Sequence, residues 1–274
     1  MRKSIASVAL GGPLLERLSA IAAAGFDGVE IFGPNLDAFD GSPRDLRRHA
    51  DSLGLSIELY QPLRDFEGAP DGRATENFTR SETTLDAMQE LGVPLLLVCS
   101  NTQPDAIADD ARAAEQLAAL AERASSRGLR IGYEALAWGT QVNTFDHAWK
   151  IVQKADRPNL GLILDSFHTL VRTEDWSGVR DLPGDRIAFV QVGDAPRVQA
   201  DPLTIRRNHS RFPGRGELGV SAFLREVLAT GYRGTISIEI FNEKAPEPAI
   251  ETAREAMAAL NEVLIEAQAN QALA

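Results

Sequence analysis

Short apolar segments recur along the chain, and longer segments with apolar positions on one helical face lie between them. The short segments are typical of β-strands, and the run at 94–99 has the continuous apolar pattern of a strand that is buried on both faces. We predict eight strands, at 4–10, 28–32, 55–60, 94–99, 129–134, 160–164, 186–192 and 235–240.

A segment with helical periodicity follows each predicted strand. In the first of these segments Leu14, Leu18 and Ile21 share one face, and a glycine that is a typical stop signal comes after them. In the second, Ser42 followed by Pro43 is typical of an N-cap and a first helical position. We predict helices at 13–24, 42–54, 75–91, 105–127, 144–155, 176–182, 220–230 and 246–267, of which 176–182 is short and weak.

Eight strand–helix pairs in 274 residues favour an α/β fold of the (β/α)8 TIM barrel type, whose usual length is about 250 residues. The alternative is a doubly wound open sheet, which would need a glycine-rich phosphate loop after the first strand. The glycines at 11–12 lack the later glycine of that loop. No linker or low-complexity segment interrupts the pattern, so we expect a single barrel domain at 1–268 and a short tail at 269–274.

Charge and composition exclude several classes of protein. The chain has 28 Lys and Arg against 39 Asp and Glu, a net charge of −11, which disfavours binding to nucleic acid. No apolar run approaches the roughly 20 residues of a membrane span, and the start of the chain fits a first strand better than a signal peptide. We therefore expect a cytoplasmic protein that binds no membrane; the sequence leaves a homo-oligomer open. The single cysteine, Cys99, excludes an intrachain disulfide and is expected in the core.

Acidic and amide side chains stand at the ends of four predicted strands. The active site of such a barrel lies at the C-terminal ends of its strands. Burying a carboxylate there requires a partner, a cation or a proton. Four oxygen donors suit a hard divalent cation such as Mg²⁺ or Mn²⁺, whereas the simpler alternative is a set of capping acids paired with arginine. The four side chains are Glu134, Asp165, Gln191 and Glu239.

His168 lies three residues after Asp165, in the predicted loop after the sixth strand. A neutral imidazole beside a cation can take up a proton, because its ordinary pKa is near neutrality. The alternative is that His168 only orients Asp165 or a loop carbonyl.

Arginines and aromatic residues follow the same strand ends. Arg64 follows the third strand, and guanidinium groups at a barrel mouth suit a carboxylate or a phosphate. For Arg206 and Arg211 a position facing solvent is an equal alternative. Other candidates in these loops are Arg207 and Ser210, with Trp138, Phe167 and Phe212 as pocket walls or as packing.

Several segments carry a family resemblance. Residues 22–32 resemble the opening of the sugar phosphate isomerase/epimerase barrels, which are xylose isomerase-like. The whole set also resembles the bacterial 3-dehydroshikimate dehydratases of quinate and shikimate catabolism, over nearly the full chain. The more specific segments are 61–68, 132–139, 164–169, 212–217 and 237–242.

This resemblance implies one divalent metal ion (Mg²⁺, Mn²⁺ or Co²⁺) and a small-molecule substrate, 3-dehydroshikimate. It implies that the four oxygen donors at the strand ends are the metal ligands and that His168 is the acid/base residue. Arg207 matches the arginine of the family better than its neighbours do, and Gln191 stands where many sugar epimerases have histidine. By resemblance the catalytic residues are His168 and Glu134, the substrate-binding residues are Arg64, Arg207, Ser210 and Trp138, and the metal ligands are Glu134, Asp165, Gln191 and Glu239.

The implied reaction is an elimination. In 3-dehydroshikimate the C4 proton is α to the C3 ketone and the hydroxyl leaves from C5, which gives protocatechuate and water after tautomerisation. We expect His168 to remove the C4 proton, and Arg64 and Arg207 to hold the ring carboxylate. Two alternatives remain: a metal-dependent ketose epimerase or isomerase, and a non-catalytic barrel that binds sugar acids.

Overall fold

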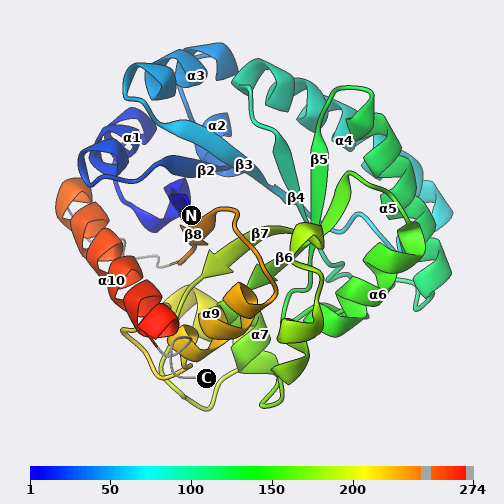
Figure 1. The fold of residues 1–274 in the computed structure, drawn as a ribbon. Coiled ribbons are helices and arrows are strands. Elements are labelled where there is room, and N and C mark those ends of the chain that lie inside the picture. Colours follow the sequence, from blue (N-terminus) through cyan, green and yellow to red (C-terminus); the bar gives the residue numbers. More distant parts are fainter. Residues whose placement is uncertain (242–247, 270–274) are drawn as a thin grey trace.

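Eight parallel strands close into a barrel in sequence order, with β1 paired to both β2 and β8 (Figure 1). The structure is a computed structural model and describes residues 1–241 and 248–269. The predicted TIM barrel is confirmed, and each predicted strand matches an observed one. The strands are β1 Lys3–Ala6, β2 Gly28–Phe32, β3 Ser56–Leu63, β4 Leu95–Cys99, β5 Arg130–Glu134, β6 Leu160–Asp165, β7 Ile187–Val192 and β8 Ile236–Ile238.

Helices surround this barrel (Figure 1). Local signals in the sequence set several of their ends: Ser42 and Asp45 form a capping box at the start of α3, and Gly92 closes α4 with a φ of +74°. The helices are α1 Leu14–Ala23, α2 Gly33–Asp37, α3 Pro43–Ser52, α4 Asp71–Leu91, α5 Asp110–Ser125, α6 Phe145–Ala155, α7 Ser166–Arg172, α8 Pro202–Asn208, α9 Val220–Ala229 and α10 Ala249–Ala269. None of these described helices is long and apolar enough to cross a membrane.

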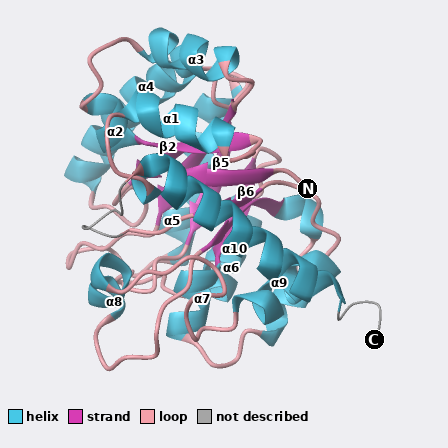
Figure 2. Cartoon of the chain, turned by 90° about the vertical axis from the view of Figure 1, so that its left-hand side faces the viewer, coloured by secondary structure: helices cyan, strands magenta, loops and turns pink. Residues whose placement is uncertain are grey.

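Three short helices, α2, α7 and α8, were not predicted, because five to seven residues are too few to show a helical period. Helix α2 directly follows β2, α7 directly follows β6, and α8 follows β7 after a loop. His168 was therefore predicted in a loop, whereas it lies in α7. Figure 2 shows α2 and α8 at one end of the barrel and the N-terminus toward the other.

Other boundaries also differ from the prediction. The first strand ends at Ala6 and a 3-10 turn follows at Ser7–Ala9, while the weak helix predicted at 176–182 is a 3-10 turn at Ser177–Asp181. Strand β8 ends at Ile238, so Glu239, which lies within the predicted strand at 235–240, follows the observed strand. Residues 246–247 of the predicted last helix, residues 270–274 of the predicted tail and Asn242 of one family segment lie outside the described residues. Ala269, the predicted first residue of the tail at 269–274, is the last residue of α10.

Two apolar clusters form the core. The larger lies between strands and helices, and the smaller fills the barrel interior. Cys99 belongs to the interior cluster and is 3% exposed, which confirms its predicted place in the core. Because side chains alternate along a strand, Tyr133 packs in the outer cluster while its neighbour Glu134 is buried against Cys99. The interior members are Leu59, Leu95, Leu97, Cys99, Leu136, Ile163, Ala188 and Phe189.

Candidate active site

The four predicted metal ligands are all buried at the C-terminal ends of their strands. Glu134 and Asp165 are the last residues of β5 and β6, and Gln191 pairs in register with Asp165. All four side chains belong to residues no more than 3% exposed. Barrel closure therefore gathers groups that are 105 positions apart in the sequence, from 134 to 239.

One compact subset of this group includes the histidine. Ligand atoms of Glu134, Asp165 and His168 lie within 4.8 Å of one another. The Nε2 of His168 is 3.8 Å from Oδ2 of Asp165. The structure thus places His168 beside two of the predicted ligands.

Arg206 lies between Asp165 and Glu239. It lies on α8 and is 2% exposed. Its Nη2 donates to Oδ2 of Asp165 at 3.0 Å and also to Oε2 of Glu239, and its Nη1 donates to the carbonyl oxygen of Glu239 at 3.0 Å. Its guanidinium carbon lies 4.9 Å from the ring centre of Phe167 and 5.2 Å from that of Phe241. The solvent-facing alternative for Arg206 is therefore wrong, and an arginine does pair with two of the strand-end acids.

Glu30 connects two amides in the barrel interior. Its Oε2 accepts from Nε2 of Gln191 at 2.7 Å and from Nε2 of Gln61 at 2.8 Å. The amide nitrogens of both glutamines therefore face Glu30. The Oε1 of Gln191 consequently points elsewhere, and it is buried without a hydrogen-bond partner among the described residues. Glu30 lies on β2, and this long-range pairing gives it a place in the site that no local sequence pattern indicates.

His168 is held in a defined orientation and charge state. Its Nδ1 accepts the backbone N–H of Ala137 at 3.1 Å, so the proton of the neutral ring lies on Nε2. Trp138 packs edge-on against the ring with centres 4.8 Å apart. Burial, and then the charges of Arg206 and Arg64, lower the pKa of His168 well below its usual value. The ring is therefore neutral near pH 7.

Burial has the opposite effect on the acids. It raises the pKa of Asp165 to about 7, although Arg206 opposes this shift, and it raises the pKa of Glu134 and of Glu30 well above the ordinary range. Burial alone would lower the pKa of Arg206, but the nearby carboxylates, Asp165 first, raise it above its usual value.

The donor set fits a divalent cation. Among the described residues Arg206 forms ion pairs with Asp165 and Glu239, whereas Glu134 has none. The Oε1 atoms of Glu134 and Gln191 are buried with no hydrogen-bond partner in the described part of the chain. Burying an oxygen without a partner destabilises the folded protein unless a cation or a proton binds to it. Oxygen donors of this kind suit Mg²⁺ or Mn²⁺.

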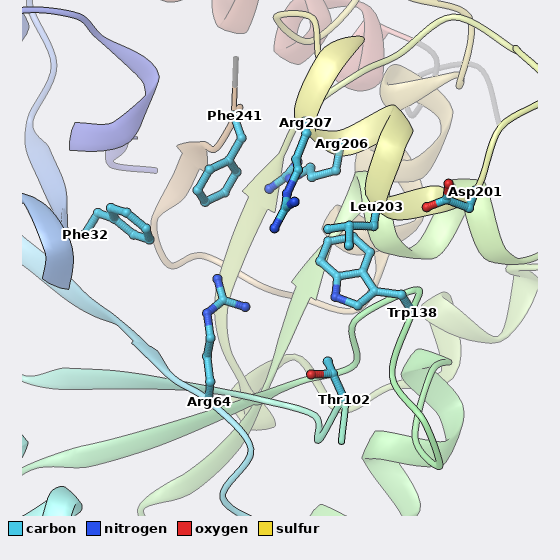
Figure 3. Close-up of a pocket in the computed structure, with 9 residues that line it drawn as sticks. All are labelled: Phe32, Arg64, Thr102, Trp138, Asp201, Leu203, Arg206, Arg207 and Phe241. Atoms are coloured by element: carbon cyan, nitrogen blue, oxygen red, sulfur yellow. The ribbon is translucent and has the colours of Figure 1, made fainter. Parts of the chain in front are cut away.

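A cavity of about 680 Å³ opens beside this cluster. Figure 3 shows Arg64 and Arg207 directing their guanidinium groups into it from different elements, with Trp138 beside Leu203 on one side. Arg64, Arg207 and Trp138, which are predicted to bind substrate, all line this cavity. Its lining residues are Phe32, Arg64, Thr102, Trp138, Asp201, Leu203, Arg206, Arg207 and Phe241.

The remaining site candidates lie elsewhere. Ser210 is buried, and its hydroxyl donates to the carbonyl oxygen of Arg206 at 2.6 Å, so it supports the end of α8. Phe212 packs in the core. The aromatic walls are instead Phe32 and Phe241, which sequence reasoning did not assign to the pocket. Their position at or just after the ends of β2 and β8 was the available signal.

Comparisons with known proteins agree with the barrel fold. A family model described as xylose isomerase-like TIM barrel matches residues 18–263. A curated 3-dehydroshikimate dehydratase of Pseudomonas aeruginosa is 56% identical over 243 residues, which are 89% of this chain and 38% of that protein. The chain thus spans about two fifths of that relative's length.

Two solved structures extend the comparison. A fusion protein of a xylose isomerase-like TIM barrel and 4-hydroxyphenylpyruvate dioxygenase superposes with a TM-score of 0.94 at 51% identity, over 96% of this chain and 42% of that one. The IolI protein, described with a bound zinc atom, superposes with a TM-score of 0.81 at 21% identity, over 97% of this chain and 98% of that one. The second similarity concerns the fold alone.

Proposed function

The chain belongs to the xylose isomerase-like TIM barrel family, and we propose that it is a 3-dehydroshikimate dehydratase, a lyase that converts 3-dehydroshikimate into protocatechuate and water. The observation that carries this proposal is the 56% identity to the Pseudomonas aeruginosa dehydratase across 89% of the chain. Because the match covers only 38% of that longer relative, we propose its activity for this chain and do not assign it. The site supplies the chemistry that the reaction needs.

The proposed cofactor is one divalent cation, Mg²⁺, Mn²⁺ or Co²⁺, held by Glu134, Asp165, Gln191 and Glu239. The orphaned Oε1 atoms of Glu134 and Gln191 support this ligand set. When bound, such an ion supplies Lewis-acid stabilisation of the negative charge that develops on the substrate oxygens. Glu30 has a positioning role, because it holds the amide nitrogen of Gln191 and leaves the amide oxygen free.

His168 moves the protons. Accepting the C4 proton at Nε2 requires the neutral tautomer with its proton on Nδ1, and therefore the contact to Ala137 broken. Uptake of that proton makes the ring an imidazolium, which then donates the Nε2 proton to the hydroxyl that leaves C5 as water and is neutral again. The lowered pKa keeps the ring neutral before the reaction and favours release of the proton from the imidazolium.

Arg64 and Arg207 hold the ring carboxylate in this proposal, since both guanidinium groups point into the cavity (Figure 3). Phe32, Trp138 and Phe241 supply apolar walls that exclude water from the ring.

An absorbance assay tests the proposal. Purified protein is incubated with 3-dehydroshikimate, and the catechol product is followed by its ultraviolet absorbance, before chelation, after chelation and after add-back of single divalent ions. We expect turnover that chelation abolishes and that at least one ion restores. A folded protein that turns over no 3-dehydroshikimate with any ion, but epimerises ketoses, would reverse the assignment.

A further inference from the structure

Arg206 holds two of the side chains that the proposed function assigns to the metal ion. We propose that this tethered guanidinium competes with the divalent cation for Asp165 and Glu239, so that ion binding displaces Arg206 into the adjoining cavity and Arg206 sets the affinity for the ion. This inference rests on the proposed function, because the ligand set comes from there.

The contacts make the competition direct. Nη2 of Arg206 donates to Oδ2 of Asp165 and to Oε2 of Glu239, one oxygen from each proposed ligand. A divalent ion on the same oxygens would lie within a few ångströms of a guanidinium. Two cations at that separation in a buried site repel each other strongly. Arg206 and the ion therefore cannot both hold these oxygens in the observed arrangement.

The adjoining cavity offers space for the displaced side chain of Arg206. Arg206 is a lining residue of the 680 Å³ cavity and stands on the short helix α8 next to Arg207, whose side chain already points into that space (Figure 3). Its Nε has no hydrogen-bond partner among the described residues, so Nη1 and Nη2 are its only polar anchors there. All three of those anchoring contacts are to Asp165 and Glu239.

The charge of the site explains why a resident cation is useful. Glu30, Glu134, Asp165 and Glu239 are each no more than 3% exposed and lie around one end of the barrel. Removing one partner from a buried ion pair leaves an uncompensated charge and is strongly destabilising. Arg206 thus stabilises the acids when no metal ion is bound, and for the same reason it weakens the binding of the ion.

Calorimetric titration of Mn²⁺ into metal-stripped protein measures the effect without using activity. We compare the wild type with Arg206→Met, with Arg206→Gln in case the first variant does not fold, and with Arg211→Met. The last removes one positive charge from an exposed loop position and is the matched control. We expect Arg206→Met and Arg206→Gln to bind Mn²⁺ at least tenfold more tightly, and Arg211→Met to stay within twofold of the wild type.

Thermal melting gives a second readout. Without metal ion, the Arg206 variants should melt at a lower temperature than the wild type, and saturating Mn²⁺ should raise their melting temperature by more than it raises that of the wild type.

The outcomes separate this inference from the proposed function. If the wild type binds Mn²⁺ and turns over 3-dehydroshikimate but the folded Arg206 variants bind the ion no more tightly, competition is overturned and the proposed function stands. If neither the wild type nor the variants bind Mn²⁺, the proposed metal centre and this inference are both overturned.

Discussion

At the scale of single residues, burial decides the protonation state of the groups in this site. His168 is 5% exposed and neutral, while Asp165 beside it has a pKa of about 7. The same two side chains on the surface would carry a positive and a negative charge at mildly acidic pH. The sequence gives the identities of these groups, and only their surroundings give their charge.

We predict that His168→Ala lowers kcat by at least about 100-fold, because general acid–base catalysis contributes roughly 10² to 10⁴ in rate. Mn²⁺ affinity should stay within a few-fold of the wild type if His168 moves protons without holding the ion. Steady-state kinetics with 3-dehydroshikimate and calorimetric titration check the two parts. A large loss of Mn²⁺ affinity would instead make His168 a metal ligand, as its closeness to Glu134 and Asp165 permits.

Arg64 should act on substrate binding. It follows β3 directly and points into the cavity (Figure 3). We predict that Arg64→Met raises KM for 3-dehydroshikimate by roughly 10- to 100-fold with a smaller change in kcat, since a charged hydrogen bond contributes about 1.5–3 kcal/mol. The control is Arg44→Met, at an exposed position of α3, which should change neither constant. An unchanged KM in Arg64→Met would remove Arg64 from the carboxylate site.

At the scale of elements, the long connection between β7 and α9 carries α8 and therefore Arg206 and Arg207. Asp194, which is 1% exposed, organises this connection. Its Oδ1 accepts the backbone N–H groups of Ala195 and Leu218 at 2.8 and 3.0 Å, and its Oδ2 accepts that of Gly214 at 3.0 Å. One carboxylate thus joins both ends of the connection.

We predict that Asp194→Ala lowers the free energy of unfolding by about 2–5 kcal/mol, because it leaves three backbone N–H groups without their acceptor. Asp194→Asn retains one acceptor oxygen and should lose roughly half as much. Urea denaturation measures both variants. Equal losses in the two, or no loss in either, would show that these hydrogen bonds do not hold the connection.

At this scale the sequence predicts the long helices well and the short helices poorly. The long helices and most strand ends follow from periodicity and local stop signals, for example the capping box of α3. The helices α2, α7 and α8 do not, because each is too short to repeat its pattern and is stabilised by contacts with the barrel. Arg206 and His168 lie on two of these helices, so their surroundings were missed with them.

At the scale of the whole molecule, closing the barrel buries acids whose pKa then depends on the fold. Glu67 is the clearest example outside the proposed metal site: it is 3% exposed, and its Oε1 accepts from the backbone N–H of Asn101 and the hydroxyl of Tyr133. Burial raises its pKa from 4.5 to about 8. A carboxyl whose pKa is raised on folding binds its proton more tightly in the folded protein. Its contribution to stability is therefore complete below pH 4.5 and is lost as the pH rises through about 8.

We predict that the free energy of unfolding of the wild type falls between about pH 5 and pH 8, and that it falls less in Glu67→Gln. At about 1.4 kcal/mol per pKa unit the difference between the two proteins reaches a few kcal/mol. Urea denaturation at several pH values, with exposed Glu90→Gln as the control, provides the measurement. Parallel pH profiles for the wild type and Glu67→Gln would contradict the raised pKa of Glu67.

The sequence by itself determined the barrel and the strand-end positions of Glu134, Asp165, Gln191 and Glu239, because alternation along a strand and the common direction of parallel strands are local properties repeated eight times. Only the tertiary structure decided which partner each of these groups meets. The pairing of Glu30 with Gln191 spans 161 positions. The insertion of Arg206 between Asp165 and Glu239 depends on how α8 packs over the barrel. Such contacts follow from distances in space between segments that are far apart in the chain, and no local pattern of residues encodes them.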